Sequence, residues 1–236
     1  MSDSHSYARH EGHDIAAESL LQIKQKSVDH MHLQPSQRVL DVGCGTGDDT
    51  LALAQVIGKD GIVHGVDYDA TMIAKARQRA GLRVVAGRVS YHHANAAALP
   101  WPDGYFDAAR SDRILQQMLD PAHAFDELLR VTRPGGRVVV ISGEWATLDV
   151  DIDDANIESR HAYFTATLVA DSALSGCCLR SMFTQRGLLD LHFEVRSAFR
   201  AADDTNGGWQ RSIAPEAAAS GLFASANVVM IAGRKP

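Results

Sequence analysis

Short apolar runs alternate with amphipathic segments along most of the chain. Seven segments have the length and composition of strands: 38–43, 61–67, 88–95, 105–111, 137–142, 188–199 and 225–236. The spacing of apolar residues predicts helices over 18–32, 48–58, 68–81 and 121–132, and one that ends at Gly187. Strands that alternate with helices are typical of parallel βαβ units with right-handed crossovers, so the pattern predicts an α/β fold.

Residues that start and stop helices mark the boundaries of these segments. Asp69 is expected to be the N-cap of one helix, and Pro121 stands in the first turn of another. Asp48 is expected to cap the helix that begins there. Gly58 and Gly81 each follow a helical segment, where glycine lets the chain leave the helix in a left-handed conformation.

Composition and charge narrow the class of protein. Apolar residues make up 45% and charged residues 22% of the 236 positions, which is typical of a globular domain. No apolar stretch approaches the roughly 20 residues that span a bilayer, and the polar N-terminus shows no secretory signal, so we expect a cytoplasmic protein without stable membrane insertion. A net charge of −6 disfavours nucleic acid as a partner. The 3 cysteines predict no disulfide framework, and the 11 histidines predict no metal site.

The segment "VLDVGCGTGDD", residues 39–49, joins a predicted strand to a predicted helix through a glycine-rich turn. Such a turn brings backbone N–H groups close to a ligand, and Asp67, at the end of the next strand, can accept from both hydroxyls of an adenosine ribose. The dinucleotide pattern G-x-G-x-x-G would place a glycine at Asp48, and the carboxylates of Asp48 and Asp49 would repel a pyrophosphate. S-Adenosylmethionine carries an adenosine without phosphates, and Asp41 can face its ammonium group. That cofactor therefore fits the turn better than a dinucleotide does.

Four motifs, in this order, resemble one protein family. They are "VLDVGCGTG" (39–47), the acidic strand end "VHGVD" (63–67), "ANAAALPWPDGYFD" (94–107) and "LLRVTRPGGRVVV" (128–140). Together they look like a class I S-adenosylmethionine-dependent methyltransferase of the small-molecule and quinone-methyltransferase branch, well over 39–142 and more weakly over 221–236. The resemblance implies a Rossmann-like, doubly wound sheet of seven strands, mostly parallel with the last strand antiparallel. The change of pattern after the fifth strand adds an inserted lid that we do not expect to be part of the sheet.

The resemblance also implies a cofactor site built from the turns that follow the first four strands. The residues expected at the methionine end are Asp41, Gly43, Cys44, Gly45, Arg110 and Ser111. The residues expected at the adenosine are Asp67, Tyr68, Met72, Asn95 and Ala96. Relatives carry an acidic residue in place of Asn95, so here an amide oxygen would accept from the adenine amino group. The product would be S-adenosylhomocysteine, and the reaction requires no metal.

The acceptor side of the expected site departs from the family pattern. Many relatives carry histidines soon after the fourth strand, where this chain reads "RILQQML" with Gln116 and Gln117. Glutamine cannot act as a general base near neutral pH, so the catalytic residue stays unknown. Either the base comes from elsewhere or the acceptor ionises by itself.

Residues 145–176 interrupt the alternation of strands and helices. The segment lacks the short regular turn expected of a simple connection between strands. We expect one methyltransferase domain over 1–236, with a lid over 145–176 that closes over the acceptor. Trp145, His161 and Phe164 are its candidates for the acceptor pocket. The alternative is that the segment packs away from the cofactor, as a contact in a homodimer.

The expected reaction is an in-line displacement that moves a methyl group from the sulfonium to an oxygen, nitrogen or carbon atom of a small-molecule acceptor. Two alternatives stay open. One is a quinone-precursor C-methyltransferase, and the other is a non-catalytic or NAD-type nucleotide-binding protein with a Rossmann-like fold.

Overall fold

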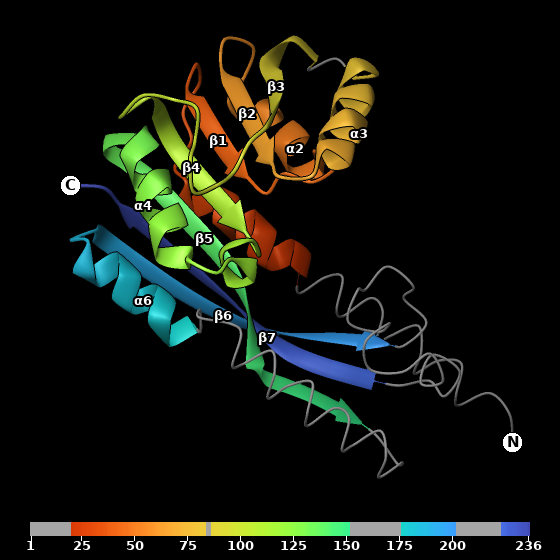
Figure 1. Cartoon of the computed structure of the whole chain (residues 1–236), viewed down its shortest axis with the longest axis vertical. Helices are drawn as coiled ribbons and strands as arrows, with labels where there is room; N and C mark the ends of the chain where they lie inside the picture. Colours follow the sequence, from red (N-terminus) through yellow and green to blue (C-terminus); the bar gives the residue numbers. More distant parts are fainter. Residues whose placement is uncertain (1–19, 84–85, 152–175, 202–222) are drawn as a thin grey trace, which may run out of the picture.

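The computed structural model describes residues 20–83, 86–151, 176–201 and 223–236, which form one seven-stranded sheet with helices around it (Figure 1). The strands, in their order across the sheet, are β3 (Val89–His93), β2 (Ile62–Asp67), β1 (Arg38–Val42), β4 (Phe106–Asp112), β5 (Thr132–Asp151), β7 (Phe223–Arg234) and β6 (Leu189–Ala201). Strands β1 to β5 pair in parallel, whereas β7 runs antiparallel to both β5 and β6. The predicted seven-stranded α/β sheet with an antiparallel last strand is confirmed.

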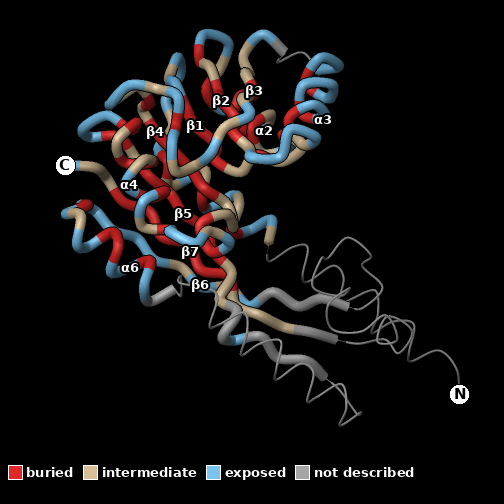
Figure 2. The backbone as a smooth tube through the Cα atoms, in the orientation of Figure 1, coloured by how far each residue is buried: buried red, intermediate tan, exposed pale blue. Residues whose placement is uncertain are grey.

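Helices cover both faces of the sheet. They are the N-terminal helix, described from Leu20 to His30, α2 (Asp48–Val56), α3 (Ala70–Gly81), α4 (Pro121–Val131) and α6 (Gly176–Gln185), with the 3₁₀ turns η1 (Ala86–Arg88) and η2 (Leu115–Gln117). Because successive strand residues point to opposite faces, Leu40 packs with α4 and α6 while Val39 packs with the N-terminal helix and α2. Figure 2 shows the buried positions gathered in the strands and on the helix faces toward them. Within the described ranges, no helix is both long and apolar enough to cross a bilayer.

The ends of the helices follow the predicted signals with two exceptions. Asp69 caps α3, since its carboxylate accepts from the backbone N–H groups of the next turn, and Gly58 follows α2 with a φ of 73°. Gly81 was predicted to lie just past α3, but it is the last residue of the helix, and Leu82 is the C-cap. Asp48 was predicted to cap α2, but the N-cap is Gly47, in a left-handed conformation without a side-chain bond.

Strand β5 is longer than the predicted strand 137–142. It continues to Asp151 because the antiparallel partner β7 supplies hydrogen bonds beyond the ends of the parallel strands, with a register shift between Glu144 and Asp149. The prediction that all of 145–176 lies outside the sheet is therefore wrong for its first seven residues, 145–151. Trp145 lies within this strand, and the other two acceptor candidates, His161 and Phe164, lie outside the described residues.

His64, on β2, is buried among aromatic rings. The rings of Trp101 and Phe106 meet it edge-on at centroid distances of 5.4 and 5.5 Å, and its Nδ1 lies 3.2 Å from Nε2 of His92. Burial, followed by the charges of His92 and Arg38, lowers the pKa of His64 from 6.5 to about 4. The folded protein therefore keeps this imidazole neutral where an unfolded chain would protonate it.

We expect His64 to make the folded state less stable in acid. Between pH 6.5 and about 4 the unfolded chain binds a proton that the folded protein refuses, so the free energy of unfolding falls as the pH falls through this window. The loss reaches about 3 kcal/mol at the acid end. Denaturant unfolding of His64→Gln, which cannot titrate, should show a shallower decline than wild type. The exposed His123→Gln is the control, and parallel pH curves for His64→Gln and wild type would contradict the assignment.

Candidate functional site

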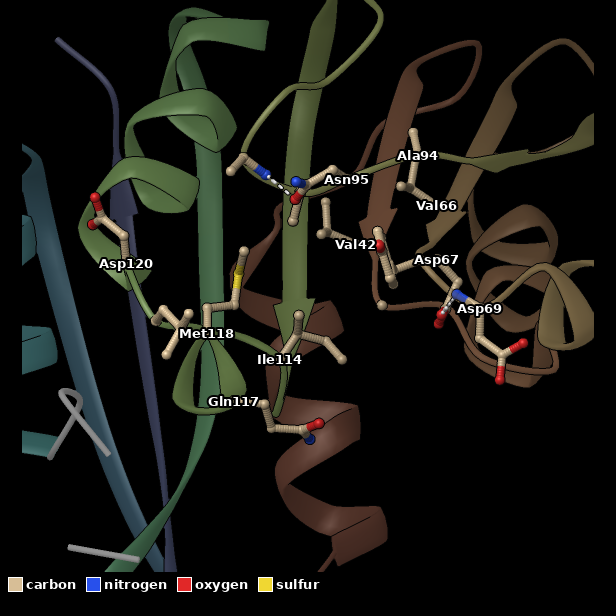
Figure 3. A pocket seen from close by; sticks show the side chains of 15 residues that line it. Val42, Val66, Asp67, Asp69, Ala94, Asn95, Ile114, Gln117, Met118 and Asp120 are labelled. Carbon is tan, nitrogen blue, oxygen red and sulfur yellow. Dashed lines mark hydrogen bonds between the residues drawn. The ribbon is translucent and has the colours of Figure 1, made fainter. Parts of the chain in front are cut away.

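A pocket of about 510 Å³ lies at the carboxyl ends of β1 and β2 and beside the loops that follow β3 and β4 (Figure 3). Its volume is in the range of small-molecule sites, about 300–1,000 Å³. Its lining residues are Val42, Gly43, Val66, Asp67, Tyr68, Asp69, Ala94, Asn95, Ala96, Ala97, Ile114, Gln117, Met118, Leu119 and Asp120. In open parallel sheets ligands bind at this edge, next to the point where the strand order reverses. Here that point lies between β1 and β4, whose helices cover opposite faces of the sheet.

The glycine-rich turn after β1 forms one wall of the pocket and depends on glycine at two positions. Gly43 has a φ of 79°, and a Cβ atom there would lie 1.9 Å from Cγ1 of Ile114. Gly47 has a φ of 84°, and a Cβ atom there would lie 2.4 Å from the hydroxyl oxygen of Tyr91. Any other residue would be strained at both positions and would push against a neighbouring side chain. The turn therefore packs directly against Ile114, which follows β4.

Asp67 ends β2 and ties the glycine-rich turn to the next helix. Its Oδ2 accepts from the backbone N–H of Gly45 at 2.9 Å, and its Oδ1 accepts from the N–H of Asp69 at 2.9 Å. Each carboxylate oxygen has further accepting capacity, so the group can still receive two hydroxyls from a ligand. Its orientation is set before any ligand arrives.

Asn95 and Ala96 form the wall that follows β3. The Asn95 amide oxygen accepts from the backbone N–H of Ala97 at 2.9 Å, which fixes the orientation of the amide (Figure 3). In the part of the chain that the structure describes, no acceptor faces the N–H of Ala96. Tyr68, 76% exposed, stands at the edge of this wall, and its carbonyl oxygen lies 2.8 Å from Nε2 of His93. The wall thus presents a backbone donor and an oriented amide to a ligand.

The pocket is acidic. Asp67 and Asp69 lie on one side of it and Asp120 on the other (Figure 3). Asp120 caps α4 by accepting from the N–H of His123 at 3.0 Å. None of the described lining residues is a lysine, arginine or histidine. Such a pocket favours a cationic ligand and disfavours a phosphorylated one.

Several residues expected at the cofactor lie outside this pocket. Asp41 is 2% exposed, and its Oδ2 accepts from the Thr50 hydroxyl at 2.8 Å; burial raises its pKa. Because side chains alternate along β1, Val42 faces the pocket while Asp41 points to the opposite face of the sheet, toward α2. The other expected residues that do not line the pocket are Cys44, Gly45, Met72, Arg110 and Ser111. Of these, Gly45 still contributes through its bond to Asp67.

Arg110 is the centre of a buried ion cluster that joins distant parts of the chain. Its Nη2 lies 2.7 Å from Oδ2 of Asp49 and 3.2 Å from Oδ2 of Asp112, and its side chain is 1% exposed. Lys24, on the N-terminal helix, lies 2.8 Å from the same Asp49 oxygen, and Arg113 lies 2.8 Å from Oδ1 of Asp112. Although burial raises the pKa of Asp112, Arg113 and Arg110 hold that pKa below its usual range. The cluster fixes α2, β4 and the N-terminal helix against one another.

The two glutamines expected at the acceptor have different places. Gln116 is buried, and its Oε1 accepts from the Ser142 hydroxyl at 2.9 Å and from the backbone N–H of Gly143, so it connects η2 to β5. Gln117 lines the pocket, and its Nε2 donates to the carbonyl oxygen of Arg113 at 2.8 Å. Only Gln117 is therefore available to a molecule in the pocket.

The sequence analysis did not identify three apolar residues of the pocket, Ile114, Met118 and Leu119. Only their position in the chain could have identified them as pocket residues, because they follow the carboxyl end of a strand at the edge where ligands bind. Nothing in their residue types distinguished them from core residues. Leu119 is fully exposed and Met118 is half-buried, so the pocket has an apolar border.

Comparison with known proteins identifies the family. A family model described as a methyltransferase domain matches residues 33–199. An uncharacterized 37.1 kDa protein of transposon Tn4556 from Streptomyces fradiae is 32% identical over 181 residues, which cover 76% of this chain and 51% of that protein. The ubiquinone/menaquinone biosynthesis C-methyltransferase UbiE of Proteus mirabilis is 35% identical over 126 residues, or 53% of this chain and 50% of UbiE.

A solved structure shares the fold over nearly its whole length. The crystal structure of the YcgJ protein from Bacillus subtilis superposes with a TM-score of 0.68 at 18% identity and covers 93% of this chain and 98% of that one. In contrast, this chain spans about half the length of the curated relatives it matches. The family match over more than half of the residues, together with the seven-stranded sheet, shows that the chain belongs to the methyltransferase-domain family, in the class I S-adenosylmethionine-dependent group.

Proposed function

We propose that this protein transfers a methyl group from S-adenosylmethionine to a small-molecule acceptor. The observation that carries the proposal is the charge of the pocket, which has three carboxylates and no basic side chain among its described lining residues. S-Adenosylmethionine carries a sulfonium and an ammonium group and no phosphate, so this pocket attracts it. NAD carries a pyrophosphate, which the same carboxylates repel, so an NAD-type function is disfavoured.

The residues of the pocket support a placement of this cofactor along it. Asp67 would accept from the ribose hydroxyls, as its position at the end of β2 suggests. Ala96 would donate its backbone N–H to the adenine ring, and Asn95 would meet the adenine amino group with the remaining capacity of its amide oxygen. Gly43 and Ile114 would lie along the methionine end. The carboxylates at the rim would offset the positive charge of the bound molecule.

For this reaction the protein would mainly have to position the cofactor and the acceptor and exclude water from them. When bound, the cofactor supplies an electrophilic methyl group on a sulfonium that leaves as a neutral thioether. The apolar border of Ile114, Met118 and Leu119 would keep water from the reacting atoms, and the rigid glycine-rich turn would keep the cofactor in line with the acceptor. Gln117 cannot take a proton, so an acceptor that requires deprotonation must use another group.

The acceptor is proposed to be a small molecule with an apolar body, because the border that it would cross is apolar. Quinone-precursor C-methylation is a second candidate, favoured by the identity with UbiE and by the same apolar border. We further propose that the part of 145–176 beyond β5 acts as the lid, with His161 and Phe164 at the acceptor. Substitution of either residue should then change acceptor turnover and leave cofactor affinity nearly unchanged.

We expect calorimetry to show S-adenosylmethionine and S-adenosylhomocysteine binding with about micromolar affinity, or roughly −8 kcal/mol, and NAD not binding. Incubation with methyl-labelled cofactor and a cell extract should then transfer label to a low-molecular-weight metabolite. Supplying a demethylated quinone precursor in place of the extract tests the second candidate. Binding of NAD without S-adenosylmethionine would overturn the proposal, and binding without transfer to any metabolite would indicate a non-catalytic protein.

A further inference from the structure

Two histidines and a glutamate meet where the N-terminal helix lies beside the edge strand β6. The residues are His30, His192 and Glu194, and their potential ligand atoms all lie within 4.8 Å of one another. His30 is in the last turn of the N-terminal helix, whereas His192 and Glu194 stand two residues apart on β6 and therefore share one face of the strand. Three metal-ligating side chains thus converge from two elements that are far apart in the sequence.

The positions of the three side chains leave Oε2 of Glu194 facing the His192 ring. The rings of His30 and His192 stack with centroids 3.8 Å apart and an interplanar angle of 21°, so their ring edges lie side by side. Nε2 of His192 lies 3.8 Å from Oε2 of Glu194. The other carboxylate oxygen, Oε1, accepts from Nε of Arg196 at 2.9 Å, which fixes the carboxylate and leaves Oε2 directed at the imidazoles.

We propose that His30, His192 and Glu194 form a site for a divalent transition metal, with Zn²⁺ as the best match. Two imidazole nitrogens and one carboxylate oxygen are a donor set that zinc takes in proteins. Ligands at about 2.0–2.1 Å in a tetrahedron lie about 3.3 Å apart, so the ligand atoms of the present cluster need to close by about 1.5 Å at most. The two stacked rings must also turn so that a nitrogen of each faces the same ion. The His192 side chain is 45% exposed, so an ion can enter from solvent and water can fill the fourth position.

A single carboxylate accompanies the two imidazoles of the cluster. The carboxylate of Glu194 offers a cation one negative charge beside the two nitrogen donors. Arg196, bonded to Oε1 of Glu194, would keep the carboxylate ligand oriented.

The site would act on stability and not on methyl transfer. The neighbouring His32 contacts Arg137, at the amino end of the parallel part of β5, so the cluster lies toward the end of the sheet opposite the pocket. The same helix carries Lys24, which joins the ion cluster around Arg110. A metal at His30 would therefore fix the far end of a helix whose other end supports the cofactor side of the fold. The proposal departs from the sequence-based expectation of no metal and does not depend on the proposed activity.

The test is a titration of ZnCl₂ into the full chain, purified without a histidine tag and dialysed against EDTA. We expect calorimetry to show one Zn²⁺ per chain with micromolar affinity, and Co²⁺ in its place to give the visible absorption bands of a low-coordinate site. Zinc at a hundredfold excess over its Kd should raise the Tm by about 5–10 °C. His192→Ala and Glu194→Gln should each weaken binding by at least about tenfold and remove most of the thermal shift.

Two controls distinguish this cluster from other histidines. His123→Ala removes an exposed histidine on α4 and should leave zinc affinity unchanged. His10→Ala with His13→Ala removes an H-x-x-H pair outside the described residues and should also leave the tight site intact. The proposal is overturned if no saturable binding occurs, or if binding survives both β6 substitutions and is lost with the His10 and His13 pair.

Discussion

Asp67→Ala should weaken S-adenosylmethionine binding by about tenfold to several hundredfold, because hydrogen bonds to a charged group contribute about 1.5–3 kcal/mol each. The substitution removes the proposed acceptor of both ribose hydroxyls. It also removes the bonds from the N–H groups of Gly45 and Asp69, each 2.9 Å long, that connect the glycine-rich turn to α3. The loss should therefore combine a missing contact with a looser turn. Calorimetry with S-adenosylhomocysteine measures it without interference from turnover.

Two further variants separate these contributions. Asp67→Asn keeps one acceptor oxygen and should lose less affinity than the alanine variant. Asp48→Ala removes a nearby carboxylate that pairs with Arg79 at 2.8 Å on the surface and does not line the pocket, so its effect on affinity should be small. Equal losses for Asp67→Ala and Asp48→Ala would show that Asp67 does not bind the ribose.

Arg110→Met should lower the free energy of unfolding by about 3–5 kcal/mol, since it removes the buried cation and leaves Asp49 and Asp112 with only the partly exposed Lys24 and Arg113 as counter-charges. Asp49 and Asp112 would each lose a guanidinium contact, and Asp41, opposite Arg110 in the strand register, would lose a compensating charge. For a domain of this size the expected fall in Tm is about 6–20 °C. Thermal and denaturant unfolding of the variant beside wild type measure the effect.

The matched control is Arg113→Ala, which removes another cation from Asp112. Its side chain is 42% exposed, so we expect a loss below about 1 kcal/mol. Adding Asp49→Asn to Arg110→Met should recover part of the stability, because the carboxylate that lost its guanidinium partner is then replaced by a neutral amide. If Arg110→Met were as stable as Arg113→Ala, the ion cluster would not be a main contribution to the stability of the fold.

The elements of the fold were largely predictable because their signals are local. The glycine-rich turn, the Asp69 cap and the apolar runs of the strands depend on residues within a few positions of each other. Asp67, which lines the pocket, ends a predicted strand and was placed by that rule, whereas Asn95 was placed by the resemblance to the family. The length of β5 was not predictable in the same way, because its last residues pair with β7, more than seventy positions away.

Local sequence was thus enough for the α/β architecture, the glycine-rich turn and the carboxylate that ends β2, because backbone conformation and side-chain periodicity decide them. Only the tertiary structure determines which side chains contact one another or line the same pocket. It turns Asp41 away from the pocket while Val42 faces it, joins Lys24 and Arg110 through Asp49, and brings His30 to β6. These contacts join segments up to about 160 positions apart, and their energies depend on burial and distance, which no local pattern contains.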